Sequence, residues 1–371
     1  VGKLAKGVLG FLRREVVLSA AIVLAAASAF LVPPDAQYFS YIDWDTLALL
    51  FGLMAVMQGF QKAGLFVFLG SRLLRRAATV RGMLFVLVFL PFVCSMVITN
   101  DVSLITFVPF GITVLRMAGK EKLLVPMAVL QTAAANLGSM LTPMGNPQNL
   151  YLYTRSAMGF GEFCWLMLPY TAVSALCLAA LVWCRKREPV SGAPAAAPAP
   201  SLRSLLPAAA GFLLCLLALF DLLPAIGVAA VAAVFLLAFD RPLLARVDYS
   251  LLATFAAFFI FTGNLGRLES FRDFLFSILE GRVEGVAVLA SQVISNVPAA
   301  LLLSGFTQDW PALIVGCNLG GLGTLIASMA SLISYKQVGR EYPGERRRYF
   351  FWFTLCNIGL LAVLLGTAAL L

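Results

Sequence analysis

Residues 136–153 read Asn-Leu-Gly-Ser-Met-Leu-Thr-Pro-Met-Gly-Asn-Pro-Gln-Asn-Leu-Tyr-Leu-Tyr, and residues 318–335 read Asn-Leu-Gly-Gly-Leu-Gly-Thr-Leu-Ile-Ala-Ser-Met-Ala-Ser-Leu-Ile-Ser-Tyr. Both stretches open on Asn-Leu-Gly and close on Tyr at the same spacing. Each lies in an apolar run that Gly and small polar residues interrupt, which predicts a helix broken in its middle. Two such interrupted segments, in corresponding positions of the two halves of a membrane chain, are typical of a transporter's binding site.

The composition indicates that this chain folds in lipid. Its 371 residues are 61% hydrophobic and 12% charged, and its mean hydropathy is +0.93. A soluble fold cannot cover that much apolar surface, whereas helices of about 20 apolar residues span a bilayer. We therefore predict an all-α, multi-pass protein of the bacterial inner (plasma) membrane, with membrane lipid as its surroundings.

The same composition disfavours several other functions. The net charge of +9 comes from Lys and Arg in short clusters between apolar runs, which indicates topology signals and no nucleic-acid partner. The sequence contains no His, and its 7 Cys form no CxxC pair and are interpreted as small hydrophobic residues. We find no P-loop, no nucleophile–base pairing and no selectivity-filter signature, which disfavours an enzyme, an ATP-driven pump or a channel.

The distribution of basic residues favours one topology. We place the amino terminus in the cytoplasm and interpret 82–116 and 271–303 as re-entrant hairpins that turn back at a polar tip. The cytoplasmic side then collects most of the basic residues, beginning with Lys3, Lys6, Arg13 and Arg14. The outside keeps only Arg155, Arg267, Arg272 and Arg282. This asymmetry is the one expected when basic loops stay in the cytoplasm.

The predicted topology makes the two halves inverted repeats, a common plan for secondary transporters. The predicted parts are a first repeat over 1–184 with hairpin 82–116 and broken helix 121–153, a cytoplasmic Ala/Pro linker over 185–204, and a second repeat over 205–371 with hairpin 271–303 and broken helix 311–335. One unbroken helix is expected over 46–69. Asp43 and Asp248 precede corresponding helices and are interpreted as N-terminal caps.

The hairpin tips and the helix breaks carry the predicted site. Helix ends at such tips expose carbonyl groups that can coordinate Na⁺ and N–H groups that can hold an anion, and Asn, Ser and Thr add neutral oxygen ligands. The candidates for substrate and ion binding are Thr99, Asn100, Asp101, Gly138, Thr142, Gly145, Asn146, Asn149, Ser295, Asn296, Val297, Thr324, Ala327 and Ser328. The alternative is that the tip residues only cap helices and that the glycines only pack helices together.

Asp101 is the only acidic residue expected near the middle of the membrane. An isolated Asp there costs about 2.5–3.5 kcal/mol on insertion scales, so it needs a partner or water. A bound cation, a proton or Lys62 are the candidate partners. Lys62 has the alternative of extending its side chain to the inner surface, which we favour.

At these residues the chain resembles the ion-transporter superfamily of divalent anion:sodium symporters, citrate transporters, arsenite permeases and a class of Na⁺/H⁺ antiporters. The symporters carry Ser-Asn-Thr at each hairpin tip, where this chain has Thr99-Asn100-Asp101 and Ser295-Asn296-Val297. The resemblance implies two Na⁺ sites, one at Thr99, Asn100 and Gly138 and one at Ser295, Asn296 and Ala327. It also implies a homodimer in which a transport domain slides against a scaffold, an elevator.

Two details refine the resemblance. Neither tip keeps the final Thr that contacts substrate carboxylate in the dicarboxylate symporters, and the Asn-Asp tip is closer to arsenite permeases. The break Gly145-Asn146-Pro147-Gln148-Asn149 is similar to that of small bacterial permeases grouped with citrate-type transporters.

The sequence thus predicts a secondary active transporter of a small anion, either a carboxylate or an inorganic oxyanion. Na⁺ or H⁺ is the expected coupling ion, and no other cofactor is expected. The alternative is a Na⁺/H⁺ antiporter or an arsenite-type efflux carrier that uses Asp101.

Overall fold

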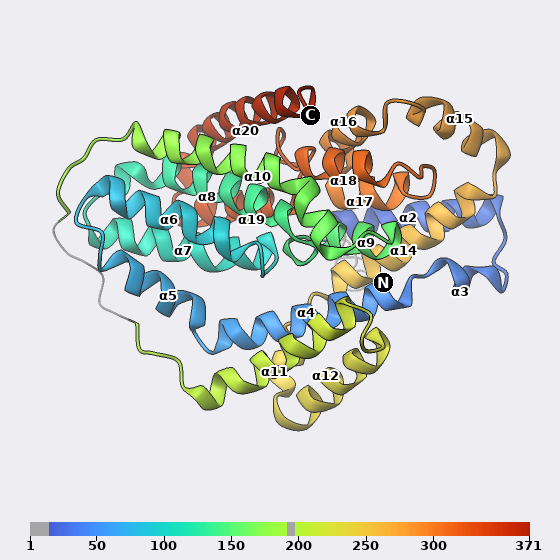
Figure 1. The fold of residues 1–371 in the computed structure, drawn as a ribbon, viewed down its shortest axis with the longest axis horizontal. Helices are drawn as coiled ribbons and strands as arrows, with labels where there is room; N and C mark the ends of the chain where they lie inside the picture. Colours follow the sequence, from blue (N-terminus) through green and yellow to red (C-terminus); the bar gives the residue numbers. More distant parts are fainter. Residues whose placement is uncertain (1–14, 191–196) are drawn as a thin grey trace, which may run out of the picture. The chain divides into compact units, whose positions relative to one another are not determined.

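The computed structural model describes residues 15–190 and 197–371. Lys3, Lys6, Arg13, Arg14 and the middle of the predicted linker therefore lie outside the described residues. The described chain consists of helices and short 3₁₀ turns, with one isolated β-bridge between Thr79 and Pro189. This confirms the predicted all-α class (Figure 1).

The chain divides into two compact units, each assembled from separate stretches of sequence. Of the described residues, the first unit comprises 15–58, 211–283 and 301–308, and the second comprises 59–190, 197–210, 284–300 and 309–371. Helices of the first unit, including two that continue into the second, are α2 (Val16–Leu31), α3 (Gln37–Tyr41), α4 (Trp44–Lys62), α11 (Leu202–Leu219), α12 (Ala225–Phe239), α13 (Arg241–Leu244), α14 (Tyr249–Gly266) and α15 (Glu269–Leu279).

The second unit holds the remaining helices, except that residue 283 of α16 and residues 301–303 of α17 belong to the first. They are α5 (Leu65–Leu74), α6 (Val80–Cys94), α7 (Asn100–Met117), α8 (Leu124–Gly138), α9 (Pro147–Ser156), α10 (Phe160–Trp183), α16 (Val283–Ile294), α17 (Asn296–Leu303), α18 (Trp310–Leu319), α19 (Met329–Glu341) and α20 (Arg346–Ala368). The 3₁₀ turns are η1 (Glu121–Leu123), η2 (Ser139–Leu141), η3 (Pro143–Gly145) and η4 (Pro343–Glu345).

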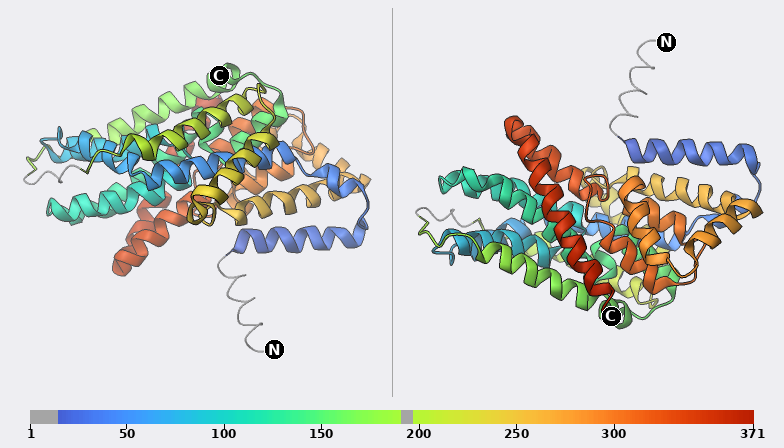
Figure 2. Two further views of the ribbon diagram at one scale, coloured as in Figure 1. Left: turned by 90° about the horizontal axis from the view of Figure 1, so that it is seen from below. Right: turned by 90° about the horizontal axis from the view of Figure 1, so that it is seen from above.

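Helix α8 forms the centre of the second unit. It packs against α6, α7, α10, α19 and α20, the last drawn in deep red in Figure 2. Ala133, Ala134 and Ala135 are wholly buried, and such small side chains let neighbouring helices approach closely. Directly before these alanines, Thr132 Oγ1 lies 2.7 Å from Ser334 Oγ of α19.

Tyr349 of α20 completes this hydroxyl cluster. Its Oη lies 2.9 Å from Ser334 Oγ and 3.0 Å from Thr132 Oγ1, and the Tyr349 side chain is wholly buried. Buried hydroxyl groups need partners, and here three helices supply them to one another. The cluster therefore ties α8, α19 and α20 together.

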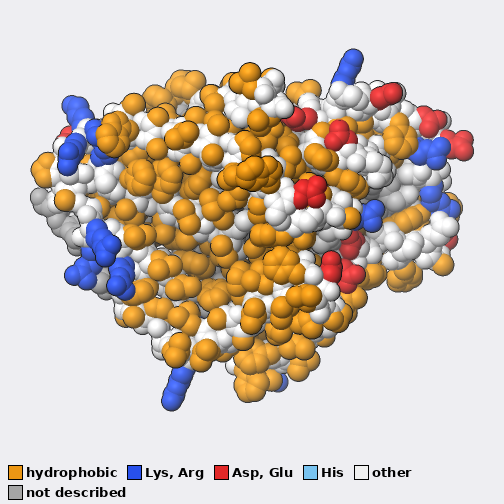
Figure 3. All heavy atoms as spheres, viewed as in Figure 1, with side chains coloured by type: hydrophobic (Ala, Val, Ile, Leu, Met, Phe, Trp, Pro, Cys, Tyr) orange, Lys and Arg blue, Asp and Glu red, His pale blue; other side chains and the backbone are white. Residues whose placement is uncertain are grey.

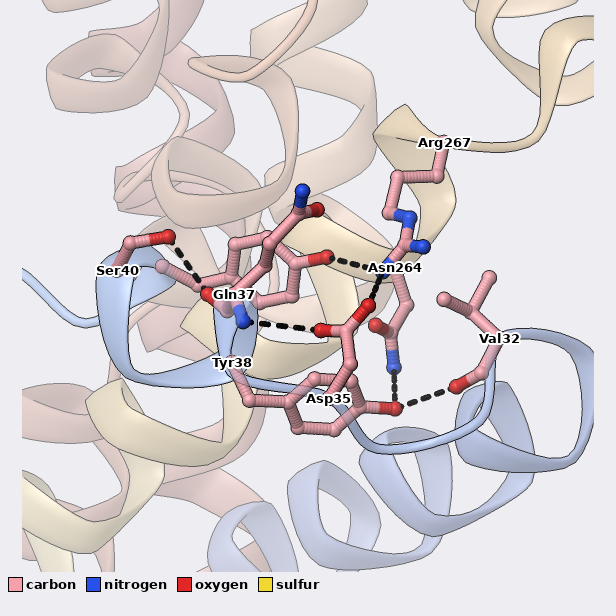
Figure 4. Close-up of polar contacts among 8 residues, drawn as sticks. Val32, Asp35, Gln37, Tyr38, Ser40, Asn264 and Arg267 are labelled. Carbon is pink, nitrogen blue, oxygen red and sulfur yellow. Dashed lines mark hydrogen bonds and ion pairs between the residues drawn. The ribbon is translucent and has the colours of Figure 1, made fainter.

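In the first unit, α14 packs against α2, and a polar clasp joins them (Figure 4). The buried Asn264 Nδ2 donates to Tyr38 Oη at 2.8 Å and to Ser28 Oγ at 3.0 Å. On the exposed side, Arg267 Nη1 contacts Asp35 Oδ2 at 2.7 Å. This hydrogen bond lowers the pKa of the Asp35 carboxyl below its ordinary value.

The surface suits a membrane. Five helices among the described residues are long and apolar enough to cross a bilayer, or six when the bent pair α4–α5 counts as one span. Hydrophobic side chains dominate the visible face in Figure 3. Large exposed apolar residues such as Phe30, Trp165 and Phe239 are at least three-quarters exposed, as expected where lipid is the solvent.

Some helix boundaries differ from the expectation. The helix predicted over 46–69 ends at Lys62, and Gly64, at φ 75°, starts a bend of 53° into α5. Glycine adopts this left-handed backbone without steric cost. The apolar stretch 271–303 contains α15, α16 and α17, because Gly281 at φ 66° and then Ser295 at φ 74° turn the chain.

The two predicted caps are confirmed. Asp43 Oδ1 accepts from Thr46 N at 3.0 Å, and Asp248 Oδ1 accepts from Leu251 N at 2.9 Å. Both carboxylates thus satisfy a free N–H in the first turn of a helix.

Candidate functional site

The two predicted tips lie at the starts of helices. Helix α6 ends at Cys94, and a turn of several residues leads to Asn100, the first residue of α7. Helix α16 ends at Ile294, and a single residue, Ser295, separates it from Asn296, the first residue of α17. Asn100 is 2% exposed and Asn296 is 3% exposed. Two buried amide side chains therefore stand at helix N-termini, where the first N–H groups have no acceptor within the regular helix.

The two predicted breaks are also present. In the first half, η2 and η3 separate α8 from α9, with Pro143 and Pro147 at the first positions of η3 and α9. In the second half, residues 320–328 separate α18 from α19. Proline lacks an N–H group and cannot continue the preceding helix, which explains the first interruption. Gly323, at φ 99°, provides a left-handed turn in the second.

Asn136, on α8, joins segments from both halves of the sequence. Its Oδ1 accepts from Asn100 Nδ2 at 2.9 Å and from Ser328 Oγ at 3.1 Å. Its Nδ2 donates to Ser331 Oγ at 3.2 Å. The first tip, the first broken helix and the second break thus meet at one side chain, which is 6% exposed.

Asn318, which opens the second stretch as Asn136 opens the first, makes the corresponding contact. Asn318 Nδ2 donates to Asn149 Oδ1 at 2.8 Å, and Asn149 holds the same place in the first stretch that Ser331 holds in the second. Each broken helix therefore donates a hydrogen bond to the helix that follows the other break.

Further contacts repeat between the halves. Thr142 Oγ1 donates to Met96 O, and Thr324 Oγ1, its counterpart, donates to Gln292 O at 3.2 Å. Met96 and Gln292 lie at the same distance before their tip Asn. These matched pairs place each break against the segment that precedes the tip of its own half.

Glycine allows the same close approach in both halves. A Cβ at Gly138 would lie 2.7 Å from Ser95 Oγ, and one at Gly320 would lie 2.5 Å from Ser291 Oγ. Real Cβ atoms do not come so near, so only glycine fits without rearrangement. Ser95 and Ser291 are corresponding positions and are both buried.

The second tip gathers oxygen atoms. Ser295 Oγ lies 3.3 Å from Ala327 O and 3.5 Å from Asn296 Oδ1, and Asn296 N donates to Ala327 O at 2.9 Å. The three predicted Na⁺ ligands of the second half are thus brought together. At the first tip, Asn100 reaches the first break through Asn136, two residues before Gly138.

The remaining first-half residues support the break itself. Asn146 Nδ2 donates to Ser139 Oγ at 3.0 Å, and Asn149 Nδ2 donates to the carbonyl oxygens of Ser139 and Thr142. A Cβ at Gly145 would lie against the backbone of Ser139. These contacts join the end of the first break to its beginning.

The other predicted residues lie at the edges. Thr99 and Asp101 are half-buried, and Asp101 N donates to Asn100 Oδ1 at 2.9 Å. Val297 is buried beside its tip, whereas Thr324 is exposed. The predicted residues therefore form a buried centre of amide and hydroxyl side chains. Thr99, Asp101 and Thr324 are more exposed than this centre.

The structure adds residues that the sequence analysis did not select, namely Ser95, Asn136, Ser291, Gln292, Asn318 and Ser331. Asn136 and Asn318 open the two matched stretches, a signal that the sequence offered. Gln292 carried no comparable signal, because the corresponding residue of the first half is Met96.

Six buried side-chain oxygens have no hydrogen-bond donor among the described residues, and two of them, Asn318 Oδ1 and Gln148 Oε1, belong to residues of the two matched stretches. The Asn318 amide cannot simply turn over, because its Nδ2 donates to Ile314 O at 2.8 Å as well as to Asn149 Oδ1. Buried acceptors of this kind cost about 1–3 kcal/mol each when unpaired. A buried water, another bound hydrogen-bond donor or a cation would satisfy them.

Comparison with known proteins identifies relatives of this chain. The family model described as citrate transporter matches residues 8–308. Inner membrane protein YbiR of Escherichia coli (strain K12) is 32% identical over 353 residues, which cover 93% of this chain and 92% of that protein. Uncharacterized transporter MJ0456 of Methanocaldococcus jannaschii is 31% identical over 303 residues, 81% of this chain and 82% of that protein. Silicon efflux transporter LSI3 of Oryza sativa subsp. japonica is 33% identical over 139 residues, 37% of this chain and 28% of that protein.

Proposed function

The chain belongs to the citrate transporter family, and from this membership we propose that it is a secondary active transporter of a small anion, a carboxylate or an inorganic oxyanion. The coupling ion is Na⁺ or H⁺. The observation that carries the proposal is the junction at Asn136, where Asn100 of the first tip and Ser328 of the second break donate to one amide oxygen. A solute held there contacts elements of both halves, as alternating access requires.

The second tip supports a cation site. An ion of the size of Na⁺ or Ca²⁺ binds oxygens at about 2.3–2.6 Å, so ligands at right angles lie about 3.3–3.7 Å apart. Ser295 Oγ lies 3.3 Å from Ala327 O and 3.5 Å from Asn296 Oδ1, within this range. We assign Na⁺ to these three oxygens, and a second Na⁺ to Thr99, Asn100 and Gly138.

The anion is held by neutral groups in this proposal. Helices α7 and α17 begin at Asn100 and Asn296, and the N-terminus of a helix carries partial positive charge that favours an anion. A bound Na⁺ adds a full positive charge nearby. The substrate site needs no Lys or Arg, because these two sources supply the positive potential.

We extend the proposal to the architecture. The matched contacts of Thr142 with Met96 and of Thr324 with Gln292 support two inverted repeats with re-entrant hairpins. All candidate residues fall in the second unit, which supports an elevator in which this unit carries the solute. A homodimer with cytoplasmic amino termini completes the proposed assembly.

Transport in proteoliposomes tests the site. With an inward Na⁺ or H⁺ gradient, we expect uptake of a substrate found by screening di- and tricarboxylates and oxyanions for an increase in melting temperature. Asn100→Ala and Asn296→Ala should each abolish uptake, while Thr354→Ala, half-buried on α20 and outside the candidate set, should leave it unchanged. Unchanged uptake in both Asn variants would contradict the site.

A second candidate is a Na⁺/H⁺ antiporter or an arsenite-type efflux carrier. It is favoured by Asp101, half-buried in the first turn of α7, and by the resemblance to a protein named as a silicon efflux transporter. Asp101→Asn should abolish proton coupling in that case. In a Na⁺–anion symporter the same variant should reduce transport only modestly.

A further inference from the structure

Gln292, on α16 one helical turn before the second tip, contacts the second break along its length. Its Nε2 donates to Gly320 O and to Leu322 O, each at 2.9 Å. Its Oε1 accepts from Thr324 N at 2.9 Å. One amide side chain thus satisfies three backbone groups that the interruption of the helix leaves without helical partners.

The backbone of the second break lies close against the Gln292 side chain. Gly323 has φ 99°, and a Cβ placed there would overlap Gln292 Oε1. Thr324 Oγ1 adds a bond to Gln292 O at 3.2 Å. Backbone and side chain of Gln292 therefore both hold residues 320–324 against the hairpin.

A short series of hydrogen bonds leads from Gln292 to the second tip. Thr324, whose N–H is bound by Gln292, accepts at its own carbonyl from Ala327 N at 3.2 Å. Ala327 O in turn accepts from Asn296 N at 2.9 Å and from Ser295 Oγ at 3.3 Å. The carbonyl that completes the oxygen cluster at this tip is therefore located by the turn that Gln292 fixes.

The first half has no glutamine at the position that corresponds to Gln292. Met96 stands at the corresponding position, and a thioether side chain cannot donate hydrogen bonds to two carbonyl groups. There the break is held by its own residue, Asn149, whose Nδ2 donates to Ser139 O and Thr142 O. The difference follows from one residue in each hairpin.

We propose that Gln292 is a positioning residue for the second tip: its amide holds the break 320–324 so that Ala327 O completes the oxygen cluster with Ser295 and Asn296. The inference rests on the proposed cation site for its functional consequence. Gln292 itself does not touch the ion. It fixes the carbonyl that does.

Two exchanges between the halves form the test. Gln292→Met gives the second half the first-half residue, and Met96→Gln is the matched control. Gln292→Glu keeps an acceptor for Thr324 N but loses the donor to Gly320 O and Leu322 O. All three variants retain an unbranched side chain of similar length, at a helical position for Gln292 and in a turn for Met96, so folding is expected to survive.

Hydrogen–deuterium exchange measures the positioning directly. In purified full-length protein, peptides that cover 320–328 should exchange at least about tenfold faster in Gln292→Met and Gln292→Glu than in wild type, since each tenfold is about 1.4 kcal/mol of local opening. Met96→Gln should leave them unchanged. Unchanged exchange in both Gln292 variants overturns the inference.

Thermal stabilisation by Na⁺ alone, with choline as the control cation, measures the consequence. The Na⁺ midpoint should rise about tenfold in Gln292→Met and stay within about twofold of wild type in Met96→Gln. Faster exchange with an unchanged midpoint also overturns the inference. If Na⁺ fails to stabilise the wild type, the proposed Na⁺ site is wrong, and the exchange experiment alone then decides whether Gln292 positions the break.

Discussion

The candidate site has two half-sites, each made of one tip and the break of the same half of the sequence. They share a sequence pattern but are built differently. In the first, the tip amide of Asn100 is bound to Asn136 and the break is held by its own Asn149. In the second, the tip turns on Ser295 at φ 74°, and Gln292 of the hairpin holds the break. The tip amide Asn296 makes no corresponding bond to Asn318, whose Oδ1 has no donor among the described residues.

The difference separates a self-supporting half-site from one that depends on its hairpin. In the first half, Asn149 binds two carbonyl groups of the break, and the contact with the segment before the tip is the single hydrogen bond from Thr142 to Met96 O. In the second half, a movement of α16 moves Gln292 and with it the carbonyls of the break. We infer that the second half-site is the more adaptable one.

Glycine substitution should give the largest effects and separate the halves. A Cβ at Gly138 overlaps the backbone of Phe92, which cannot move aside, whereas at Gly320 the nearest atoms belong to the Ser291 side chain. Overpacking costs about 1–3 kcal/mol, or roughly 2–10 °C in melting temperature. We expect Gly138→Ala near the upper end of this range and Gly320→Ala near its middle, measured by thermal unfolding in detergent.

Gly359→Ala is the matched control, because a Cβ at Gly359 meets open space. It should be neutral or slightly stabilising, as is usual for Gly→Ala in a helix. Equal losses at Gly138 and Gly320 would remove this distinction between the halves.

Truncation of the two corresponding Asn residues should give the next largest effects. Asn136→Ala leaves Asn100, Ser328 and Ser331 without their partner. Asn318→Ala removes the donor to Asn149 Oδ1 together with an acceptor that was itself unpaired. Since each lost buried partner costs about 1–3 kcal/mol, we expect a drop of roughly 6–8 °C for Asn136→Ala and about half of that for Asn318→Ala. A larger loss at Asn318 would argue against the asymmetry.

The turn at the second tip predicts a smaller effect, a difference in melting temperature between the Gly and Ala variants of the tip residue. Ser295 has φ 74°, where glycine is favoured over residues that carry a Cβ, whereas Thr99 at the first tip has φ −62°. Ser295→Gly should therefore unfold about 2–4 °C above Ser295→Ala, equivalent to about 1 kcal/mol. At Thr99 the order should reverse, with Ala above Gly. The same order at both positions would contradict the difference between the tips.

The smallest effect lies outside both half-sites. The hydrogen bond from Arg267 lowers the pKa of Asp35 below its ordinary value of 3.8, so this ion pair stabilises the fold at neutral pH. The stabilisation is lost as pH falls below about 4 and through the lowered pKa of the folded protein. Asp35→Asn should lower the melting temperature slightly at pH 7 and not below that range.

Asp221→Asn, at an exposed position with no ion pair among the described residues, serves as the control for the Asp35 experiment. Because the pair of Asp35 and Arg267 is exposed, salt should weaken it. A pH-independent difference between Asp35→Asn and wild type would show that the carboxylate charge does not stabilise the clasp.

The interrupted helices and the tips were predictable because they depend on residue types with strong local rules. Pro143 and Pro147 remove N–H groups, glycines permit unusual backbone, and Asn100 and Asn296 stand before apolar helices. The bend after α4 was missed although Gly64 marks it, because a single glycine in a long apolar run is usually tolerated within a helix.

The partners of these residues were not predictable from one sequence. Asn136 meets Ser331, and Gln292 meets Thr324, through tertiary packing that no local spacing encodes. A Gln on an apolar helix has many possible roles until its neighbours are known. The difference between Met96 and Gln292 therefore matters only in the folded protein, where each residue lies beside the break of its own half.

The hydroxyl cluster of Thr132, Ser334 and Tyr349 has a consequence for biogenesis. Thr132 and Ser334 are 202 residues apart. At roughly 5–20 residues per second, a ribosome needs about 10–40 s to supply the second partner after the first. During that interval Thr132 has only its hydrogen bond to Ala128 O within α8, and Asn136 only the one from Asn100 of the earlier helix α7. These two bonds hold the polar side chains until α19 and α20 arrive, and a chain cut before Tyr349 should be degraded although the missing helix contains no residue of the site.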